Sequence, residues 1–200
     1  VVSAPGKRNP QETKLTDLLY TTYDLASKNL DFSVPWKMIC DRYIDIAKDL
    51  HLATKIGEDL SALENQLKNE FETVTTDFLV SRGEYLCARL MAEYLNAQFV
   101  DSFELIAFDE HYRITSNSYE TIAQKLSDEN QLYVVPGFYG EGPRKQVKTF
   151  SRGGSDISGA ILANGIHAVA YENWTDVSGM LMTDPRIVKN PQPISYVSYR

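Results

Sequence analysis

The hydrophobic and polar positions follow a helical period through the first half of the chain. Apolar side chains recur every three or four residues from about residue 15 to 26, and the same spacing returns between residues 34 and 71. A period near 3.6 residues predicts helices that bury one face. Because the polar faces of residues 34–80 are highly charged, we interpret this stretch as a helical arm outside the sheet, either a lid-like insertion that moves or a static packing element.

The second half of the chain alternates two kinds of pattern. Three short apolar runs predict strands: residues 104–108, 132–136 and 168–174. Three helical patterns lie among them: residues 83–96, 119–126 and 155–164. The chain also opens with Val1 and Val2, which we interpret as the end of a buried strand. Strands that alternate with helices are typical of an α/β fold, in which helices cover both faces of a parallel sheet.

Composition and charge narrow the classes of function. The 20 Lys and Arg residues and the 27 Asp and Glu residues give a net charge of −7, which disfavours a general nucleic-acid binder. No apolar run reaches the roughly 18 residues that a membrane span requires. The two cysteines, Cys40 and Cys87, form no CxxC pair, and the histidines show no metal-binding spacing. We therefore expect reduced thiols, no metal site and a cytoplasmic location.

A glycine pair in the second half is the most informative motif. Gly153 and Gly154 precede a predicted helix, whose start Ser155 or Asp156 can cap. The unpaired N–H groups of such a helix start can bind an anion. Arg152 adds a planar donor for a carboxylate or a phosphate. The same residues also fit an ordinary glycine turn beside a surface arginine, and both interpretations stay open.

A second candidate is the run S-R-G-E at residues 81–84, which we expect to open a helix. There Glu84 is either an ordinary first-turn carboxylate, stabilised by the helix dipole, or a ligand for an ammonium group. The pattern alone favours the first interpretation.

Established phosphate loops are absent from the sequence. Gly137 and Gly142 have the Walker A spacing, but Pro143 and Arg144 occupy the lysine and hydroxyl positions.

Short motifs along the whole chain match those of the aspartokinases, in the same order. They are S-A-P-G-K at residues 3–7, G-E at 83–84, G-F-x-G at 137–140, R-G-G-S-D at 152–156, W-T-D-V-S-G at 174–179 and T-D-P-R at 183–186. Each motif is weak by itself, but the ordered set is highly specific. The chain therefore resembles the catalytic domain of the aspartokinases, which are members of the amino-acid kinase family.

This resemblance implies the amino-acid kinase fold, a three-layer αβα sandwich with a central, mainly parallel sheet. The implied reaction transfers the γ-phosphoryl group of ATP, carried with Mg²⁺, to the side-chain carboxylate of L-aspartate. The product, 4-phospho-L-aspartate, begins lysine, threonine and methionine biosynthesis. Residues 1–200 would form a partial catalytic domain, with residues 130–200 on the nucleotide side. The full-length protein would be a homo-oligomer, with neither nucleic acid nor membrane as partner.

The resemblance also implies roles for individual residues. Glu84 would hold the ammonium group of aspartate, and Arg152 its α-carboxylate. Four further residues would lie at the same substrate pocket: Ser3, Thr16, Gly153 and Ser155. Asp156 would be catalytic, because it would orient the lysines that neutralise the transferring phosphoryl group. Three residues would contact the nucleotide: Thr175 and Asp176 at the nucleoside, and Arg186 at the phosphates.

Departures from the aspartokinase pattern leave other functions open. The lysine loop of the family, K-F-G-G-T/S-S, and its regulatory domains are missing, and Leu181 stands where many members have a tyrosine. We therefore expect a catalytic fragment that is inactive alone. One alternative is another kinase of the family, acting on acetylglutamate or uridylate. The other is a non-catalytic module that binds a ligand without turnover. The G-E and R-G-G-S-D motifs favour aspartate, because they offer separate partners for the ammonium and the α-carboxylate.

Overall fold

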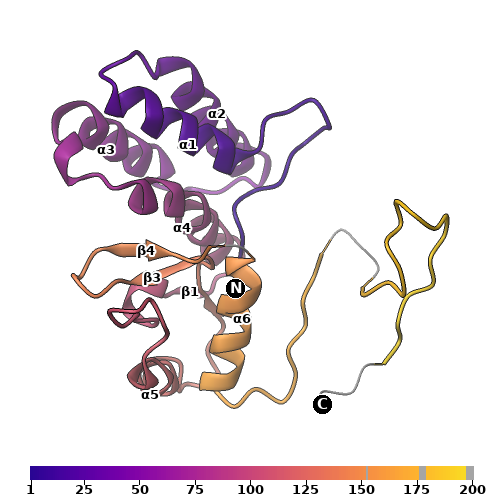
Figure 1. The fold of residues 1–200 in the computed structure, drawn as a ribbon. Coiled ribbons are helices and arrows are strands. Elements are labelled where there is room, and N and C mark those ends of the chain that lie inside the picture. Colours follow the sequence, from indigo (N-terminus) through magenta and orange to yellow (C-terminus); the bar gives the residue numbers. More distant parts are fainter. Residues whose placement is uncertain (152, 176–178, 197–200) are drawn as a thin grey trace. The chain divides into compact units, whose positions relative to one another are not determined.

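The computed structural model describes residues 1–151, 153–175 and 179–196, and it forms two compact units, Val1–Ala170 and Tyr171–Arg200 (Figure 1). The first unit contains the described helices and strands. Its α-helices are α1 (Leu15–Ser27), α2 (Ser33–Asp49), α3 (Ile56–Asn69), α4 (Thr76–Tyr94), α5 (Ser116–Lys125) and α6 (Gly154–Gly165). Its strands are β1 (Gln98–Phe99), β2 (Tyr133–Val134), β3 (Tyr139–Glu141) and β4 (Val147–Thr149). Two short 3₁₀ turns are η1 (Phe71–Thr73) and η2 (Ser102–Glu104).

The first half of this unit is helical, as the period of its apolar residues predicts. Helices α1, α2 and α3 gather beside the long helix α4, which leads from them to the strands (Figure 1). Their shared core is apolar, and Leu19, Ile39 and Leu79 are almost completely buried in it. The helix expected over residues 15–26 corresponds to α1. Both α2 and α3 lie inside the stretch that we interpret as a helical arm.

Parallel strand segments form the sheet of the second half. Strands β1 and β2 pair in parallel. The N–H of Val100 donates to the carbonyl of Val134 at 3.0 Å, whereas the N–H of Val2 donates to the carbonyl of Val135 at 3.1 Å. Because successive carbonyls of a strand point to opposite edges, β2 lies between Val2 and β1. Val2 thus pairs with this sheet through an isolated bridge to Pro136, and Val1 is half exposed, so the expected end of a buried strand is formed only in part.

The two faces of β2 pack against different helices. Val134 packs against Ala88 of α4. The next residue, Val135, belongs to a cluster that contains Ile122 of α5 and Ile161 of α6. Since successive side chains of a strand point to opposite faces, the sheet lies between α4 on one side and α5 and α6 on the other. This arrangement confirms the α/β class and the expected three layers.

Helix α4 begins earlier than the sequence predicts. We expect a helix start at Gly83, but α4 begins at Thr76, where the hydroxyl of Thr75 accepts a hydrogen bond from the N–H of Phe78 at 3.1 Å. Gly83 lies inside the helix because another segment approaches it closely. A Cβ at this position would lie 3.1 Å from the Cβ of Ala4. The predicted start is wrong because this glycine serves close packing and not a helix end.

Of the three strands predicted in the second half, the structure contains one, part of another and not the third. Residues 132–136 contain β2, which confirms that prediction. Residues 104–108 begin in η2, and only Ala107 and Phe108 form isolated bridges. Residues 168–174 form no strand, and the side chain of Val169 is fully exposed. An apolar run becomes a strand only where another strand can pair with it, and the described residues provide no such partner for this segment.

The second unit, Tyr171–Arg200, is described by itself. Leu181 forms an antiparallel bridge to Pro193, and the N–H of Ile194 donates to the carbonyl of Met180 at 2.7 Å.

None of the helices described for this chain is long and apolar enough to cross a lipid bilayer. The described residues also contain no group of three or more His, Cys, Asp or Glu side chains placed to hold a metal ion.

Candidate functional site

One cavity brings together most of the residues singled out in the sequence. We call it the α6 cavity, because the start of α6 forms one of its walls. Its volume is about 430 Å³, and its lining residues are Ser3, Lys14, Thr16, Glu84, Phe138, Gly153, Gly154, Ser155 and Asp156. They come from the segment that follows the bridge at Val2, the start of α1, the interior of α4, the segment after β2 and the start of α6.

The wall at α6 is built by close approach of two backbone segments. Gly153 caps the helix with φ of +58°, a left-handed conformation that glycine adopts without strain. A Cβ at Gly137 would lie 2.7 Å from the Cα of Ser155, and a Cβ at Gly154 would lie 2.9 Å from the Cα of Phe138. The two glycines therefore let the end of a sheet strand touch the first turn of α6. The first N–H groups of an α-helix point out of its N-terminus, and such a helix start favours an anion.

Glu84 supplies the opposite charge. Its side chain is only 6% exposed, well inside α4. One oxygen, Oε1, accepts a hydrogen bond from the N–H of Ala4 at 3.2 Å. The other, Oε2, is buried and has no hydrogen-bond partner among the described residues. Burial raises the pKa of this carboxyl to about 7. A buried oxygen without a partner is costly, so the site is suited to a ligand that donates to it.

The structure corrects the expected local setting of Glu84. The sequence places it in the first turn of a helix, where the helix dipole would stabilise its charge. Since α4 begins at Thr76, the side chain lies beyond the reach of that dipole. Its environment is a closed one: the hydroxyl of Tyr43 donates to the carbonyl of Gly83 at 2.6 Å beside it. Tertiary burial, and not the helix end, determines the chemistry of Glu84.

Two lining residues were not predicted from the sequence. Lys14 precedes α1 and is one of the residues that line the cavity. The only signal in the sequence is that this cation stands two residues before Thr16, which is a candidate substrate-binding residue. Phe138 lies within the G-F-x-G motif, and its positive φ of 82° marks a tightly constrained turn. Neither residue belongs to a motif of regular spacing, so hydrophobic periodicity could not identify them.

Other candidates are not placed at the α6 cavity by the structure. Arg152 and Asp176 lie outside the described residues. Thr175 and Arg186 belong to the second unit, Tyr171–Arg200. The guanidinium of Arg186 binds the carboxylate of Asp184, with Nη2 and Oδ2 separated by 2.6 Å. This contact raises the pKa of Arg186 further above its usual value.

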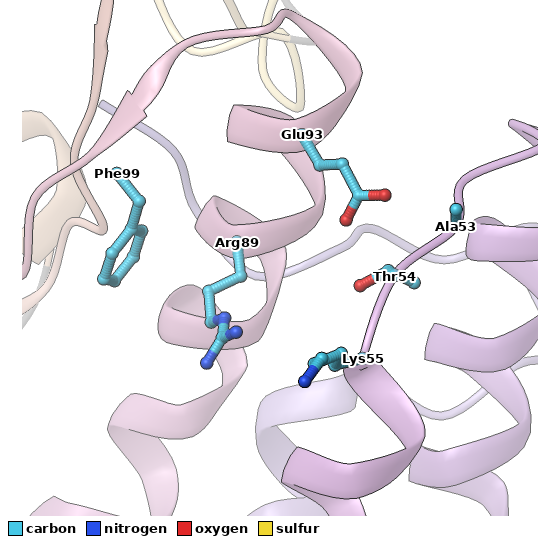
Figure 2. Close-up of a pocket in the computed structure, with 6 residues that line it drawn as sticks. All are labelled: Ala53, Thr54, Lys55, Arg89, Glu93 and Phe99. Atoms are coloured by element: carbon cyan, nitrogen blue, oxygen red, sulfur yellow. The ribbon is translucent and has the colours of Figure 1, made fainter.

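A second cavity contains none of the candidates. We call it the Arg89 cavity; it measures about 320 Å³ and is lined by Ala53, Thr54, Lys55, Arg89, Glu93 and Phe99 (Figure 2). Arg89 and Glu93 project from one helix, α4, while Lys55 lies at the start of α3 (Figure 2). The guanidinium of Arg89 is paired with Asp59 of α3 at 3.0 Å. This ion pair joins two helices of the first unit.

The chain is similar to known proteins in both sequence and fold. The chain is 35% identical to aspartokinase 3 of Bacillus subtilis over 213 residues, which covers all of this chain and 46% of that protein. It is 44% identical to the crystal structure of Clostridium acetobutylicum aspartate kinase, with a TM-score of 0.86 over 96% of this chain and 44% of that one. A structure of Escherichia coli aspartokinase III in complex with aspartate and ADP is 26% identical, with a TM-score of 0.79 over 97% of this chain and 46% of that one.

The chain therefore spans less than half the length of these relatives. The sequence pattern described as the amino acid kinase family matches residues 37–200, which is most of the chain. Its three layers also superimpose on known aspartokinase structures. By sequence and by fold alike, the chain belongs to the amino acid kinase family.

Proposed function

We propose that the chain forms the amino-acid-binding part of an aspartate kinase catalytic domain. The observation that carries this proposal is the buried oxygen Oε2 without a partner on Glu84, a residue that lines the same cavity as the start of α6. One wall favours an ammonium group and the other a carboxylate. A free amino acid with an extra carboxylate satisfies both. The similarity to proteins named aspartokinase supports the same substrate class.

The amino acid is held at both ends by this arrangement. Glu84 accepts hydrogen bonds from the ammonium group, which supplies the donor that Oε2 lacks. Arg152 binds the α-carboxylate, and the N–H groups around Gly153 and Ser155 bind a carboxylate oxygen. Ser3 and Thr16, which line the same cavity, offer hydroxyl groups as further partners. Two fixed ends leave the side-chain carboxylate as the nucleophile.

The reaction joins two anions, so the protein must orient them and neutralise their charge. A side-chain carboxylate oxygen of aspartate attacks the γ-phosphorus of ATP and forms a new P–O bond. The bond between that phosphorus and the β,γ-bridging oxygen breaks, and ADP leaves with the electron pair. Asp156 orients the cations that neutralise the transferring group, and Lys14 is a cation at the same cavity wall.

The nucleotide side is assigned to residues 130–200. Thr175 and Asp176 contact the nucleoside, and Arg186 binds the phosphates. ATP enters with Mg²⁺ as the substrate complex, and the metal supplies charge neutralisation at the phosphates. The solved Escherichia coli relative is described with aspartate and ADP, which supports a site for both ligands. The full-length protein is proposed to be a cytoplasmic homo-oligomer.

Turnover of different acceptors by the full-length protein tests this function. A coupled assay would measure ADP formation with L-aspartate, N-acetyl-L-glutamate or UMP. Of the three acceptors, we expect only L-aspartate to be turned over. N-acetylation removes the ammonium group that Glu84 requires, and UMP offers a phosphate acceptor in place of an amino acid. Turnover with either other acceptor would reassign the chain within the family. Binding of L-aspartate by calorimetry without ADP formation would indicate a non-catalytic module.

A further inference from the structure

The segment between two lining residues of the α6 cavity is fastened to the helical arm. Residues 5–13, which we call the cavity loop, connect Ser3 to Lys14. Arg42 of α2 holds this loop near both ends. Its Nη1 donates to the carbonyl of Gly6, and its Nη2 forms an ion pair with a carboxylate oxygen of Glu12. One guanidinium therefore fixes both ends of the loop.

The burial of this contact distinguishes it from ordinary surface ion pairs. Arg42 is 5% exposed, and the side chain of Glu12 is 11% exposed. Exposed ion pairs contribute little, because water and salt screen them. A buried pair behaves differently, since removing one partner leaves the other charge without compensation. The loop is thus tied to α2 by a contact that cannot be lost without consequence.

Further hydrogen bonds complete the network around Glu12. Its Oε2 accepts from the backbone N–H of Arg8 at 2.7 Å, and its Oε1 accepts from Nη2 of Arg8 at 2.7 Å. A second nitrogen of Arg8 reaches Asp45 of α2 at 3.0 Å. The hydrogen bonds from Arg8, with that from Arg42, lower the pKa of Glu12 to about 2. The carboxylate therefore stays charged and bonded at neutral pH.

The residues of this network are close in sequence to residues that line the α6 cavity. Ser3 stands shortly before Gly6, and Lys14 and Thr16 stand shortly after Glu12, so the two anchored ends of the loop adjoin the segments that carry all three lining residues. We propose that Arg42 is a positioning residue: through Gly6 and Glu12 it fixes Ser3, Lys14 and Thr16 in the geometry that binds the amino-acid substrate. This inference rests on the proposed function, and it gives the helical arm a part in the site.

Kinetics of full-length variants test the proposal. Arg42→Met keeps the apolar stem and removes both contacts, so we expect the apparent KM for L-aspartate to rise roughly tenfold while that for ATP stays unchanged. Arg42→Lys can keep one contact and should recover part of the loss. The matched control is Arg89→Met, which breaks the ion pair with Asp59 away from the α6 cavity and should change neither KM.

Two results would overturn the proposal. One is an unchanged KM for L-aspartate in Arg42→Met, and the other is an equal rise in both KM values, which would indicate a general folding defect. If Arg42→Met does not fold, Glu12→Gln provides the same test with the arginine retained. A protein without any aspartate-dependent activity would contradict the proposed function instead.

Hydrogen exchange separates those two failures. The amide of Arg8 is bonded to Glu12, so its exchange rate reports whether the cavity loop stays closed. Faster exchange in residues 5–13 of Arg42→Met, but not of Arg89→Met, would support the anchor independently of the reaction. Equal exchange in both variants and the wild type would overturn it.

Discussion

A buried glutamate with one free oxygen is the most informative single residue of this chain. Most buried polar atoms in proteins have a hydrogen-bond partner, so an exception points to a ligand or a function. Oε2 of Glu84 is such an exception among the described residues. Burial, not a neighbouring charge, is the main cause of its raised pKa. The residue therefore makes the empty site less stable and becomes fully compensated only when an ammonium group binds.

The same burial makes a prediction about stability and pH. Between its ordinary pKa of 4.5 and about 7, the folded protein holds a proton on Glu84 that the unfolded chain has released. Stability therefore falls as the pH rises through this window. Glutamine does not titrate in this range. The free energy of unfolding of Glu84→Gln, compared with that of the wild type, should therefore rise between pH 5 and 8, by roughly 3 kcal/mol in total.

Urea unfolding of the full-length proteins at several pH values would measure this difference. Glu58→Gln, on the exposed surface of α3, is the matched control and should follow the wild-type curve. Curves for Glu84→Gln and the wild type that differ only by a constant offset would contradict a raised pKa. They would indicate only a loss of packing or hydrogen bonding.

At the scale of elements, the site depends on how closely the end of the sheet approaches α6. Gly137 touches the backbone of Ser155, where no flexible side chain can move aside. Gly137→Ala should therefore destabilise the fold by about 1–3 kcal/mol, as overpacked positions typically do, and it should also weaken binding of the amino acid. Thermal unfolding and the KM for L-aspartate are the measurements.

Gly57→Ala supplies the contrast for that experiment. A Cβ at Gly57 would meet nothing within 4 Å, and the residue lies in the exposed first turn of α3. Alanine should therefore be neutral or slightly stabilising there. If both alanine variants behaved alike, close approach at Gly137 would not be the reason for a glycine at that position.

The elements also show what a sequence can and cannot predict. The helices follow from periodicity, because their burial repeats at regular intervals, whereas the strand at residues 132–136 follows from a short apolar run whose last three residues are all buried. The start of α4 does not, since Gly83 is inside the helix for the sake of a contact with Ala4, a residue far away in the sequence. Residues 168–174 have the composition of a strand, yet pairing requires a neighbour that composition cannot reveal. Likewise, the R-G-G-S-D motif predicts the wall at α6, but only tertiary structure brings Lys14 to the cavity and Arg42 to Gly6 of the cavity loop.

At the scale of the molecule, a chain of net charge −7 is proposed to bind two anionic substrates. Long-range attraction therefore cannot account for their binding, and local donors must provide it. In the first unit the proposed donors are the start of α6 and Lys14, which both line the α6 cavity. In the second unit the proposed donor is Arg186. The proposal therefore assigns the amino acid and the nucleotide to different residues of one chain.

This division predicts that the two substrates respond to different substitutions in the full-length enzyme. Thr16→Val removes a hydroxyl from the α6 cavity and should raise the KM for L-aspartate several-fold, by the roughly 1 kcal/mol of a hydrogen bond. Arg186→Ala removes a charged donor and should raise the KM for ATP roughly tenfold or more. Lys189→Ala, an exposed cation of the second unit, should change neither value. If Arg186→Ala affected L-aspartate as strongly as ATP, the nucleotide role of residues 130–200 would not hold, because one residue would then serve both substrates.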